Sequence, residues 1–355
     1  MKIAIDTSPI YDQSLISHRV RGVGFYINNL KRSLIKYFPD NKYIFFTRGD
    51  KLPKNVDLVH YPYLEPFFLT LPIFSKYKTV VTIHDLTPLV FPKYFPKGAR
   101  GNFKWFIQKA SLRKANLIIA DSLSSKKDII KYTGVPATKI HVVFLAADES
   151  FRLIHNSKFI IQNLREKYEL PEKFALYVGD VTWNKNLPRL IKAAKKSGIP
   201  LVMVGKALVS KDFDKKNPWN QDLVTVHNNV KEDKNIILPG FVETADLVQI
   251  YNLATFFIMP SLYEGFGLPI LEAMACGCPV ITTKEGSIPE VAGDAAFYTD
   301  AYDSEKIAKD MREVFKNEKL RKELSIKGLR QSSNFSWKKT ARVTVRVYEK
   351  VLGKR

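Results

Sequence analysis

Two glutamates eight residues apart are the residues of this sequence best suited to binding a small polar ligand. Glu264 and Glu272 lie in the stretch SLYEGFGLPILEAMACGCPV, residues 261–280, with two glycines and a proline between them. The apolar run before this stretch predicts a buried strand, glycines permit unusual backbone angles in a loop, and proline suits the first turn of a helix. We therefore expect Glu264 on a loop just beyond a strand and Glu272 one turn into the following helix.

The start of that helix is a suitable place for a phosphate group. The first N–H groups of a helix have no partner within it, and a glycine-bearing loop lets the backbone of residues 266–269 approach an anion closely. Carboxylates do not bind phosphate, but a carboxylate accepts two hydrogen bonds from neighbouring hydroxyl groups. The stretch therefore predicts a diphosphate with a sugar on either side, each held by one glutamate.

Two successive sets of strands and helices are expected to position these residues. Almost continuously hydrophobic runs, as in parallel strands covered on both faces, predict strands at 2–6, 43–47, 58–61, 79–84, 117–121 and 141–145, and again at 174–180, 201–205, 235–240, 256–261, 279–283 and 296–300. Helical spacing occurs at 23–38, 101–115, 124–134, 186–197, 244–254, 269–276, 303–315, 318–333 and 338–352. Residues 148–170 predict a linker with a short helix. The pattern indicates two doubly wound α/β domains facing each other across a cleft.

Length and composition are consistent with this organisation. The chain has 355 residues, 45% of them hydrophobic, which supports two domains rather than one. No run reaches the roughly 18 apolar residues of a membrane span, and the first residues, MKIAIDTSPI, do not form a signal peptide. The two cysteines, Cys276 and Cys278, have poor spacing for a disulfide or a zinc site. We expect a cytoplasmic protein with reduced cysteines.

The chain is strongly basic, with a formal net charge of +21. Residues 1–170 hold roughly 27 Lys and Arg against 13 Asp and Glu, so about +14 of the excess lies in the N-terminal half. Aromatic and basic residues alternate at 63–78 and 97–115, where Trp105 and Phe106 lie among Lys104, Lys109, Arg113 and Lys114. This combination is typical of peripheral binding to an anionic membrane. A nucleic-acid binder is the alternative that charge alone suggests, but no RNA-binding signature accompanies it, and we expect no nucleic-acid partner.

Five segments in order resemble glycosyltransferase family 4, whose members are retaining enzymes of the GT-B fold that use nucleotide-sugar donors. They are RGVGFYINNL, TIHDLTPLVFP, ALYVGDVTWNKNLPRLI, the long stretch from ILPGF to CPVIT that contains both glutamates, and FSWKKTARVTVRVYEKVL. The resemblance covers nearly the whole chain. It implies an N-terminal acceptor-binding Rossmann-like domain at 1–170, completed by a returning helix at 338–355, and a donor-binding Rossmann-like domain at 171–337.

The resemblance also implies roles for individual residues in the second domain. Glu272 binds the ribose of the nucleotide, and Glu264 contacts the ring hydroxyls of the donor sugar. Lys185 binds the diphosphate, where positive charge stabilises the leaving group. The main chain of Phe266, Gly267 and Leu268 receives the distal phosphate and the sugar, and the base lies near Phe241 and Val242.

In the first domain the resemblance implies that His84 lies near the transferred sugar and the diphosphate, where an imidazole N–H can donate a hydrogen bond. Asp85 is expected to cap the following turn. Gly22 and Gly24, which we expect in a loop after the first strand, allow close approach to the diphosphate or the acceptor, with Arg19 and Arg21 adding positive charge. The glycines do not form the Rossmann fingerprint, because they lie too far beyond the strand.

One position departs from the family. Many relatives carry an arginine directly after the glycine of the strand that opens the second domain, and this chain has Asp180 there. The departure removes one cation from the expected phosphate site. Arg189 or a residue of the first domain is a candidate for supplying the missing charge.

The expected activity is a retaining hexosyl transfer from a nucleotide sugar to a glycan or lipid-linked acceptor. GDP-mannose is the first choice of donor because the segments RGVGFY and YVG…KNL are most similar to mannosyltransferases. A UDP-hexose donor is the alternative, followed by a nucleotide-sugar epimerase or phosphorylase of the same fold. No metal cofactor is expected, since Asp212 and Asp214, the one D-x-D pair, lie in a lysine-rich loop away from the phosphate residues. The enzyme is expected in polysaccharide biosynthesis, peripheral at the inner face of the cell membrane.

Overall fold

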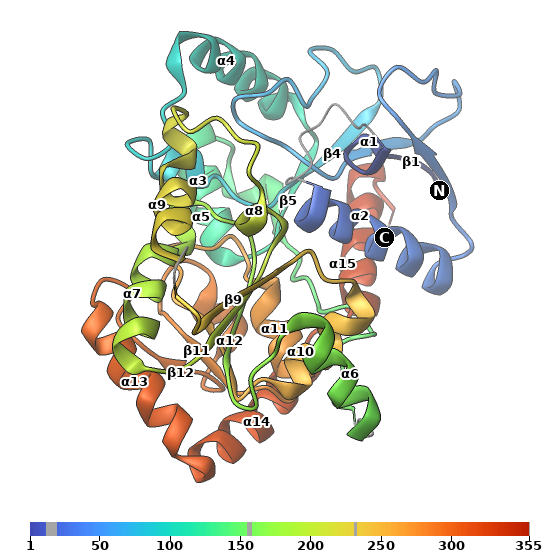
Figure 1. Ribbon diagram of the computed structural model, residues 1–355. Coiled ribbons are helices and arrows are strands. Elements are labelled where there is room, and N and C mark those ends of the chain that lie inside the picture. The colour runs from blue at the N-terminus through green and yellow to red at the C-terminus, as the bar shows by residue number, and fades with distance from the viewer. Residues whose placement is uncertain (12–19, 155–157, 231–232, 355) are drawn as a thin grey trace. The chain divides into compact units, whose positions relative to one another are not determined.

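A computed structural model describes residues 1–11, 20–154, 158–230 and 233–354 (Figure 1). The chain divides into two compact units, one made of Met1–Ala146 with Phe335–Arg355 and the other of Ala147–Asn334. Within the described ranges, no helix has the length and apolar character that crossing a bilayer requires.

The first unit contains a parallel sheet of six strands. They are β1 (Lys2–Asp6), β2 (Lys42–Phe46), β3 (Leu58–Tyr61), β4 (Lys78–Ile83), β5 (Leu117–Ala120) and β6 (Ile140–Val142), in the spatial order β2-β1-β3-β4-β5-β6. Ile3 of β1 lies in register with both Tyr43 and Leu58, so β1 separates the second strand from the third. The central strands are buried except at their end residues, as continuous hydrophobic runs predict.

Helices cover this sheet, and the last of them comes from the end of the chain. The helices are α1 (Ser8–Tyr11), α2 (Val20–Tyr37), α3 (Thr87–Val90), α4 (Gly98–Lys114), α5 (Leu123–Thr133), the short 3-10 helix η1 (Ala137–Lys139) and α15 (Trp337–Leu352). Helix α15 packs against α2 and β4, and the Thr340 hydroxyl donates to the Phe144 carbonyl at 2.7 Å. The expected return of the C-terminal helix to the first unit is confirmed.

The second unit has a parallel sheet with a different strand order. Its strands are β7 (Ala175–Val178), β8 (Leu201–Val204), β9 (Ile236–Gly240), β10 (Phe256–Met259), β11 (Val280–Thr282) and β12 (Phe297–Tyr298), arranged β12-β11-β10-β7-β8-β9. β7 and β10 lie at the centre of the sheet. β8 and β9 follow β7 towards one edge, and β11 and β12 follow β10 towards the other. This is the order of dinucleotide-binding sheets, and it reverses between β7 and β10.

The helices of the second unit are α6 (Lys158–Tyr168), η2 (Trp183–Lys185), α7 (Leu187–Ser197), α8 (Lys206–Val209), η3 (Pro218–Asn220), α9 (Gln221–Val230), α10 (Thr244–Leu253), α11 (Leu268–Ala275), α12 (Ile288–Ala292), α13 (Ser304–Lys316) and α14 (Glu318–Ser333). The sequence did not predict α9, because its composition, QDLVTVHNNV, is rich in weak helix formers. Its buried Leu223 and Val226 supply the tertiary packing that holds it helical.

The boundary between the units lies at residue 147, not at residue 170 as expected. Residues 147–170 group with the second unit, because α6 is bound to α10. Lys167 Nζ and Tyr168 Oη both donate to the Asp246 carboxylate at 2.7 Å, and the Ile154 amide donates to Asn252 Oδ1 at 2.9 Å. Polar anchors of this kind carry no apolar periodicity, so the sequence did not indicate which side the linker joins.

Candidate active site

Two loops leave the second sheet at the point where its strand order reverses. The loop after β7 contains Lys185, and the loop after β10 contains Glu264. Because β7 and β10 are adjacent and parallel, their carboxyl ends lie side by side and both loops begin there. Open α/β sheets bind ligands at this place. The topology therefore brings together two residues that lie 79 positions apart in the sequence.

Two asparagines on either side of Lys185 fasten these loops together. Asn184 Nδ2 donates to the Tyr263 carbonyl at 3.0 Å, and the Asn184 carbonyl accepts from the Leu262 amide at 2.7 Å. Asn186 Nδ2 donates to the carbonyls of Pro260, at 2.9 Å, and of Ala301, at 2.6 Å. Both side chains are buried. In the segment WNKN, the two asparagines therefore hold the loop in place and so position Lys185 between them. The sequence did not indicate this role of the asparagines.

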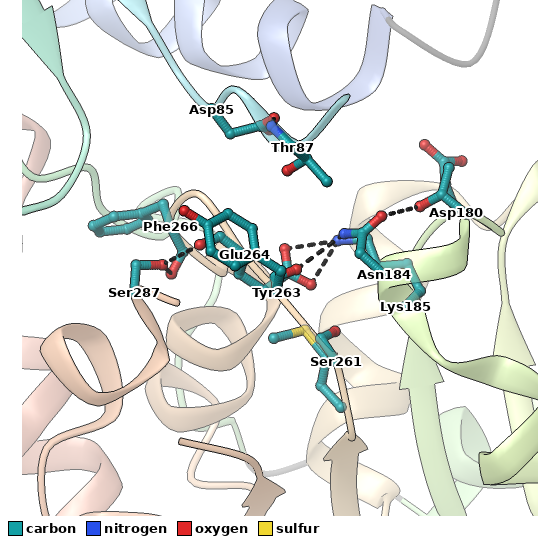
Figure 2. Close-up of polar contacts among 12 residues, drawn as sticks. Asp85, Thr87, Asp180, Asn184, Lys185, Ser261, Tyr263, Glu264, Phe266 and Ser287 are labelled. Atoms are coloured by element: carbon teal, nitrogen blue, oxygen red, sulfur yellow. Dashed lines mark hydrogen bonds and ion pairs between the residues drawn. The ribbon is translucent and has the colours of Figure 1, made fainter. Parts of the chain in front are cut away.

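Lys185 and Glu264 form a two-pronged ion pair. Lys185 Nζ lies 2.8 Å from each carboxylate oxygen of Glu264 (Figure 2). The Glu264 side chain is 8% exposed and the Lys185 side chain 21%. An ion pair shielded in this way is held more firmly than one on an open surface. The two groups expected to contact the donor sugar and the diphosphate thus neutralise each other in this structure.

The loop that carries Glu264 is fixed from its other side by Ser287. The Ser287 hydroxyl is within 3.0 Å of the carbonyls of both Glu264 and Phe266, and its amide donates to the Glu264 carbonyl. The chain approaches closely here, since a Cβ atom on Gly286 would lie 2.7 Å from the Glu264 carbonyl oxygen, and Gly286 has φ 59°. Only glycine fits this position without strain. Ser287 lies 23 residues beyond Glu264, and the sequence did not indicate this contact.

The expected strand, loop and helix around the phosphate position are confirmed. Gly267 has φ 97°, in the left-handed region, and directly precedes α11, while Phe266 is buried beneath the loop. The helix begins at Leu268, one residue earlier than predicted, so Pro269 is its second residue. The first amides of α11 therefore start at the glycine-bearing loop, the arrangement that suits an anion. The ligand roles of Phe266, Gly267 and Leu268 remain predictions.

Glu272 lies one turn into α11, as expected, and is bound to the neighbouring helix. Its Oε2 accepts a hydrogen bond of 3.0 Å from the Tyr251 hydroxyl of α10. Burial, together with the charge of Glu272, raises the pKa of the Tyr251 phenol well above its usual value, so this hydroxyl stays a donor. Phe241 is exposed and Val242 is buried, and both follow β9, the edge strand two positions from β7.

In the first unit, His84 follows β4 and is held by groups from two neighbouring strands. Its Nδ1 lies 2.6 Å from Asp121 Oδ2, beyond β5, and its Nε2 lies 3.1 Å from the Pro62 carbonyl, beyond β3. The edge of the Tyr26 ring packs against the imidazole, with ring centroids 4.8 Å apart. Asp85 accepts from the Thr87 amide at 2.9 Å, which confirms its expected capping role. Asp121 was not predicted from the sequence, although a carboxylate ending the neighbouring strand was a usable signal.

The expectation that Gly22 and Gly24 lie in a loop is wrong. Helix α2 begins at Val20, so both glycines lie within its first two turns, and a Cβ atom on Gly22 would meet nothing within 4 Å. Glycine weakens a helix, which made the predicted start three residues late, but the buried Tyr26, Ile27 and Leu30 anchor the helix by packing. Arg19 lies outside the described residues, and the Arg21 side chain is not described.

The charge that replaces the family arginine does not come from a freely extended Arg189. Its Nη1 donates to Asn186 Oδ1 at 2.8 Å, and its guanidinium carbon lies 5.9 Å from the centre of the Tyr302 ring. Arg189 therefore supports the Asn186 turn. Asp180 stays on the loop after β7, where its carbonyl accepts from the Tyr177 hydroxyl at 2.8 Å.

The described ranges contain no group of three or more His, Cys, Asp or Glu side chains placed to hold a metal ion. Asp212 and Asp214 lie in the exposed loop between α8 and η3, where Asp214 accepts from the Lys216 amide at 2.9 Å. The two cysteines are free and buried, and burial raises the pKa of the Cys276 thiol to about 12.

Two family models match the chain in sequence. "Glycosyltransferase Family 4" matches residues 8–151 and "Glycosyl transferases group 1" matches residues 160–331. The serotype-specific mannosyltransferase WbdA of Escherichia coli is 32% identical over 286 residues, which are 78% of this chain and 34% of WbdA. The chain thus spans about a third of the length of WbdA. The O-antigen chain mannosyltransferase B of E. coli is 31% identical over 281 residues, 77% of this chain and 70% of that protein.

Solved structures share the whole architecture at low identity. The sucrose-phosphate synthase of Thermosynechococcus elongatus is similar with a TM-score of 0.77 and 17% identity, over 99% of both chains. Anabaena HepE in complex with UDP and glucose is similar with a TM-score of 0.75 and 17% identity, over 99% of this chain and 100% of HepE. The expected GT-B fold, built from two Rossmann-like α/β units, is confirmed.

Proposed function

The chain belongs to glycosyltransferase family 4, and we propose from this membership that it transfers a hexose from a nucleotide sugar to a glycan or lipid-linked acceptor. The observation that supports the proposal most is the Lys185–Glu264 pair at the strand-order reversal of the second sheet. A cation and a carboxylate in contact, next to a glycine-started helix, match the charges and hydroxyls of a sugar diphosphate.

We infer a division of labour in which binding a donor separates this pair. The diphosphate takes the Lys185 ammonium, and the hydroxyls of the donor sugar take the Glu264 carboxylate. Neither charge is then left unpaired in its shielded position, where an unpaired charge is costly. Glu272, oriented by Tyr251, binds the ribose. The exchange makes a complete nucleotide sugar a better ligand than a free nucleotide, which supplies no sugar hydroxyls for Glu264.

The proposed reaction retains configuration at the anomeric carbon. The acceptor hydroxyl attacks from the face that the diphosphate leaves, and the leaving phosphate takes the proton of that hydroxyl. Lys185 and the first amides of α11 stabilise the charge that develops on the diphosphate, and His84 is proposed to contribute to the same transfer. Catalysis then consists of positioning and electrostatic stabilisation, and we propose that no metal ion is required.

Mannose from GDP-mannose is the proposed sugar and donor. The names of the two E. coli relatives, both mannosyltransferases, favour it over a UDP-hexose. A thermal-shift panel of GDP, UDP and ADP with their sugars tests this choice. A ligand at a hundredfold its Kd adds about 2.7 kcal/mol of apparent stability, and GDP-mannose is expected to give the largest shift.

The nucleotide sugars of this panel are then tested as donors in a transfer assay, with a polyprenyl-linked glycan as acceptor and with or without EDTA. We expect mannosyl transfer that EDTA leaves unchanged. A larger shift and turnover with a UDP-hexose would overturn the choice of donor. An altered sugar nucleotide formed without acceptor would indicate an epimerase, and EDTA loss restored by manganese would overturn metal independence.

We also propose that the first unit docks on an anionic membrane, where it meets the acceptor. Helix α4 exposes Phe103 and Phe106, 67% and 73% accessible, on one face, and the loop 71–77 beside it exposes Ile73 and Phe74. A pocket of about 120 Å³, lined in part by Ile73, Phe74 and Lys114, lies between the loop and the C-terminal end of α4. The same helix carries the basic residues Arg100, Lys104, Arg113 and Lys114, and Lys114 Nζ lies 4.9 Å from the centre of the Phe74 ring.

A double substitution tests the membrane surface. Phe103→Ser with Phe106→Ser is expected to lower binding to phosphatidylcholine vesicles containing phosphatidylglycerol by at least about tenfold, because each buried Phe contributes about 1.5–3 kcal/mol. Phe159→Ser on α6 is the matched control, since Phe159 is 72% exposed in the other unit. Co-sedimentation that does not depend on phosphatidylglycerol, or that the double substitution leaves intact, would contradict the proposal.

A further inference from the structure

The imidazole of His84 is surrounded by hydrogen-bond acceptors at both ring nitrogens. Nδ1 faces the Asp121 carboxylate at 2.6 Å, and Nε2 faces the Pro62 carbonyl at 3.1 Å. A carbonyl can only accept, so Nε2 must carry a proton. The second proton of the pair lies between Nδ1 and Asp121. With either position of that proton, His84 is an N–H donor at Nε2 and has no free lone pair with which to act as a base.

The groups around His84 favour keeping that second proton. From β5 comes Asp121, which is 1% exposed, and the neighbouring residue on the chain is Asp85. From α2 comes the neutral edge of Tyr26. From β3 comes His60, whose ring nitrogens bind Tyr348 and Thr82 at 2.7 and 2.8 Å. Burial lowers the pKa of the His60 imidazole to about 3, so this neighbour brings no positive charge at neutral pH.

Burial alone lowers the pKa of the His84 imidazole, but the charge of Asp121, its hydrogen bond, and Asp85 together raise it above its usual value. Burial also raises the pKa of the Asp121 carboxyl. The raised pKa of His84 and the raised pKa of Asp121 have the same consequence, because the two groups share one proton and release it as a pair. The pair therefore keeps its proton to a higher pH than an isolated histidine does.

We propose that Asp121 is a positioning residue that orients His84 and holds its ring protonated, so that His84 acts in the proposed transfer as a positive charge and not as a base. The inference rests on the proposed function and extends it to a residue outside the sequence motifs. An imidazolium cannot accept the proton of the acceptor hydroxyl, which agrees with proton transfer to the leaving phosphate.

Asp121→Asn tests this role, because asparagine keeps the shape and a hydrogen bond but removes the charge. We expect kcat of the variant to fall by about tenfold for each pH unit above the pKa of its isolated histidine, with the KM for the donor little changed. Activity should recover towards the wild-type value when the pH is lowered below about 6, where histidine is protonated without assistance. A purely structural role would give a loss that does not depend on pH.

Asp85→Asn is the matched control, since it removes an equal charge one residue from His84 without touching the imidazole. The alkaline limb of its pH profile, where activity falls as the pH rises, is expected to shift much less than that of Asp121→Asn. An equal shift in the two variants would show that any nearby negative charge raises the pKa of His84, without need of the Asp121 hydrogen bond. This result would overturn the positioning role. A pH profile of Asp121→Asn parallel to that of the wild type would also overturn it.

Nitrogen chemical shifts of the wild-type histidines provide a readout that needs no turnover. The His84 ring is expected to remain doubly protonated, or to show one proton shared with Asp121, above pH 7. Titration of His84 below its ordinary pKa of about 6.5 would overturn the inference even if the variant did not fold. Absence of transfer by the wild type would contradict the proposed function, and the chemical shifts would still decide the state of His84.

Discussion

Glu264→Gln is expected to lower kcat/KM for hexosyl transfer by about 100-fold to 1,000-fold, the loss seen when one aligned electrostatic contact to a transition state is removed. The side chain keeps its size, but an amide presents only one acceptor oxygen to the hydroxyls of the donor sugar. It also leaves the Lys185 ammonium without its counter-charge before the donor binds. Steady-state kinetics with the donor identified by the thermal-shift panel measures the effect.

A matched variant separates this loss from a general change of charge. Glu313→Gln removes the same charge from the exposed side of α13, and kinetics like those of the wild type are expected. The thermal shift with nucleoside diphosphate alone should not fall in Glu264→Gln and should rise if anything, because the free nucleotide has no hexose and no longer has to separate the Lys185–Glu264 pair. Turnover of Glu264→Gln at the wild-type rate would contradict the assignment of Glu264 and, with it, the site.

Lys185→Met is expected to lower kcat by a similar factor, about 100-fold to 1,000-fold, because the cation on the leaving diphosphate is lost. It should also destabilise the protein by about 1–3 kcal/mol, since the Glu264 carboxylate remains shielded without its partner. Urea unfolding measures the stability term and single-turnover kinetics the catalytic term. Lys192→Met, on the exposed face of α7, is the control and should change neither.

The double variant with Lys185→Met and Glu264→Gln distinguishes the two effects. Its stability should return most of the way to that of the wild type, because no unpaired charge remains in the loop. Its turnover should stay as low as that of the less active single variant, since the contacts of Lys185 and Glu264 to the donor are still absent. Recovery of turnover together with stability would show that the pair is structural, and would contradict its role in binding the donor.

Much of the fold could be predicted from local sequence. All twelve predicted strands are present, with ends that differ by at most three residues, because strands covered on both faces are continuous runs of apolar residues. Ser122 caps α5 by accepting from the Ser125 amide, and Gly134 ends it with φ 72°, and serine and glycine are the residue types that local sequence favours at these two positions. Local sequence did not predict α9 or the start of α2, where tertiary packing outweighs weak helix formers. It also did not predict the short helices α1, α3, α8 and α12, or the side to which residues 147–170 belong.

The sequence by itself determined the residue types of the candidate site, since the strand, loop and helix around Glu264 and Glu272 follow from nearby glycines, a proline and an apolar run. Only the tertiary structure showed that Lys185 is bonded to Glu264, that Ser287 holds the glutamate loop, and that Asp121 holds His84. The backbone preference of a segment depends on a few neighbouring residues, so it can be predicted from their types. Contacts between the ends of adjacent strands depend on strand order, which no single segment encodes.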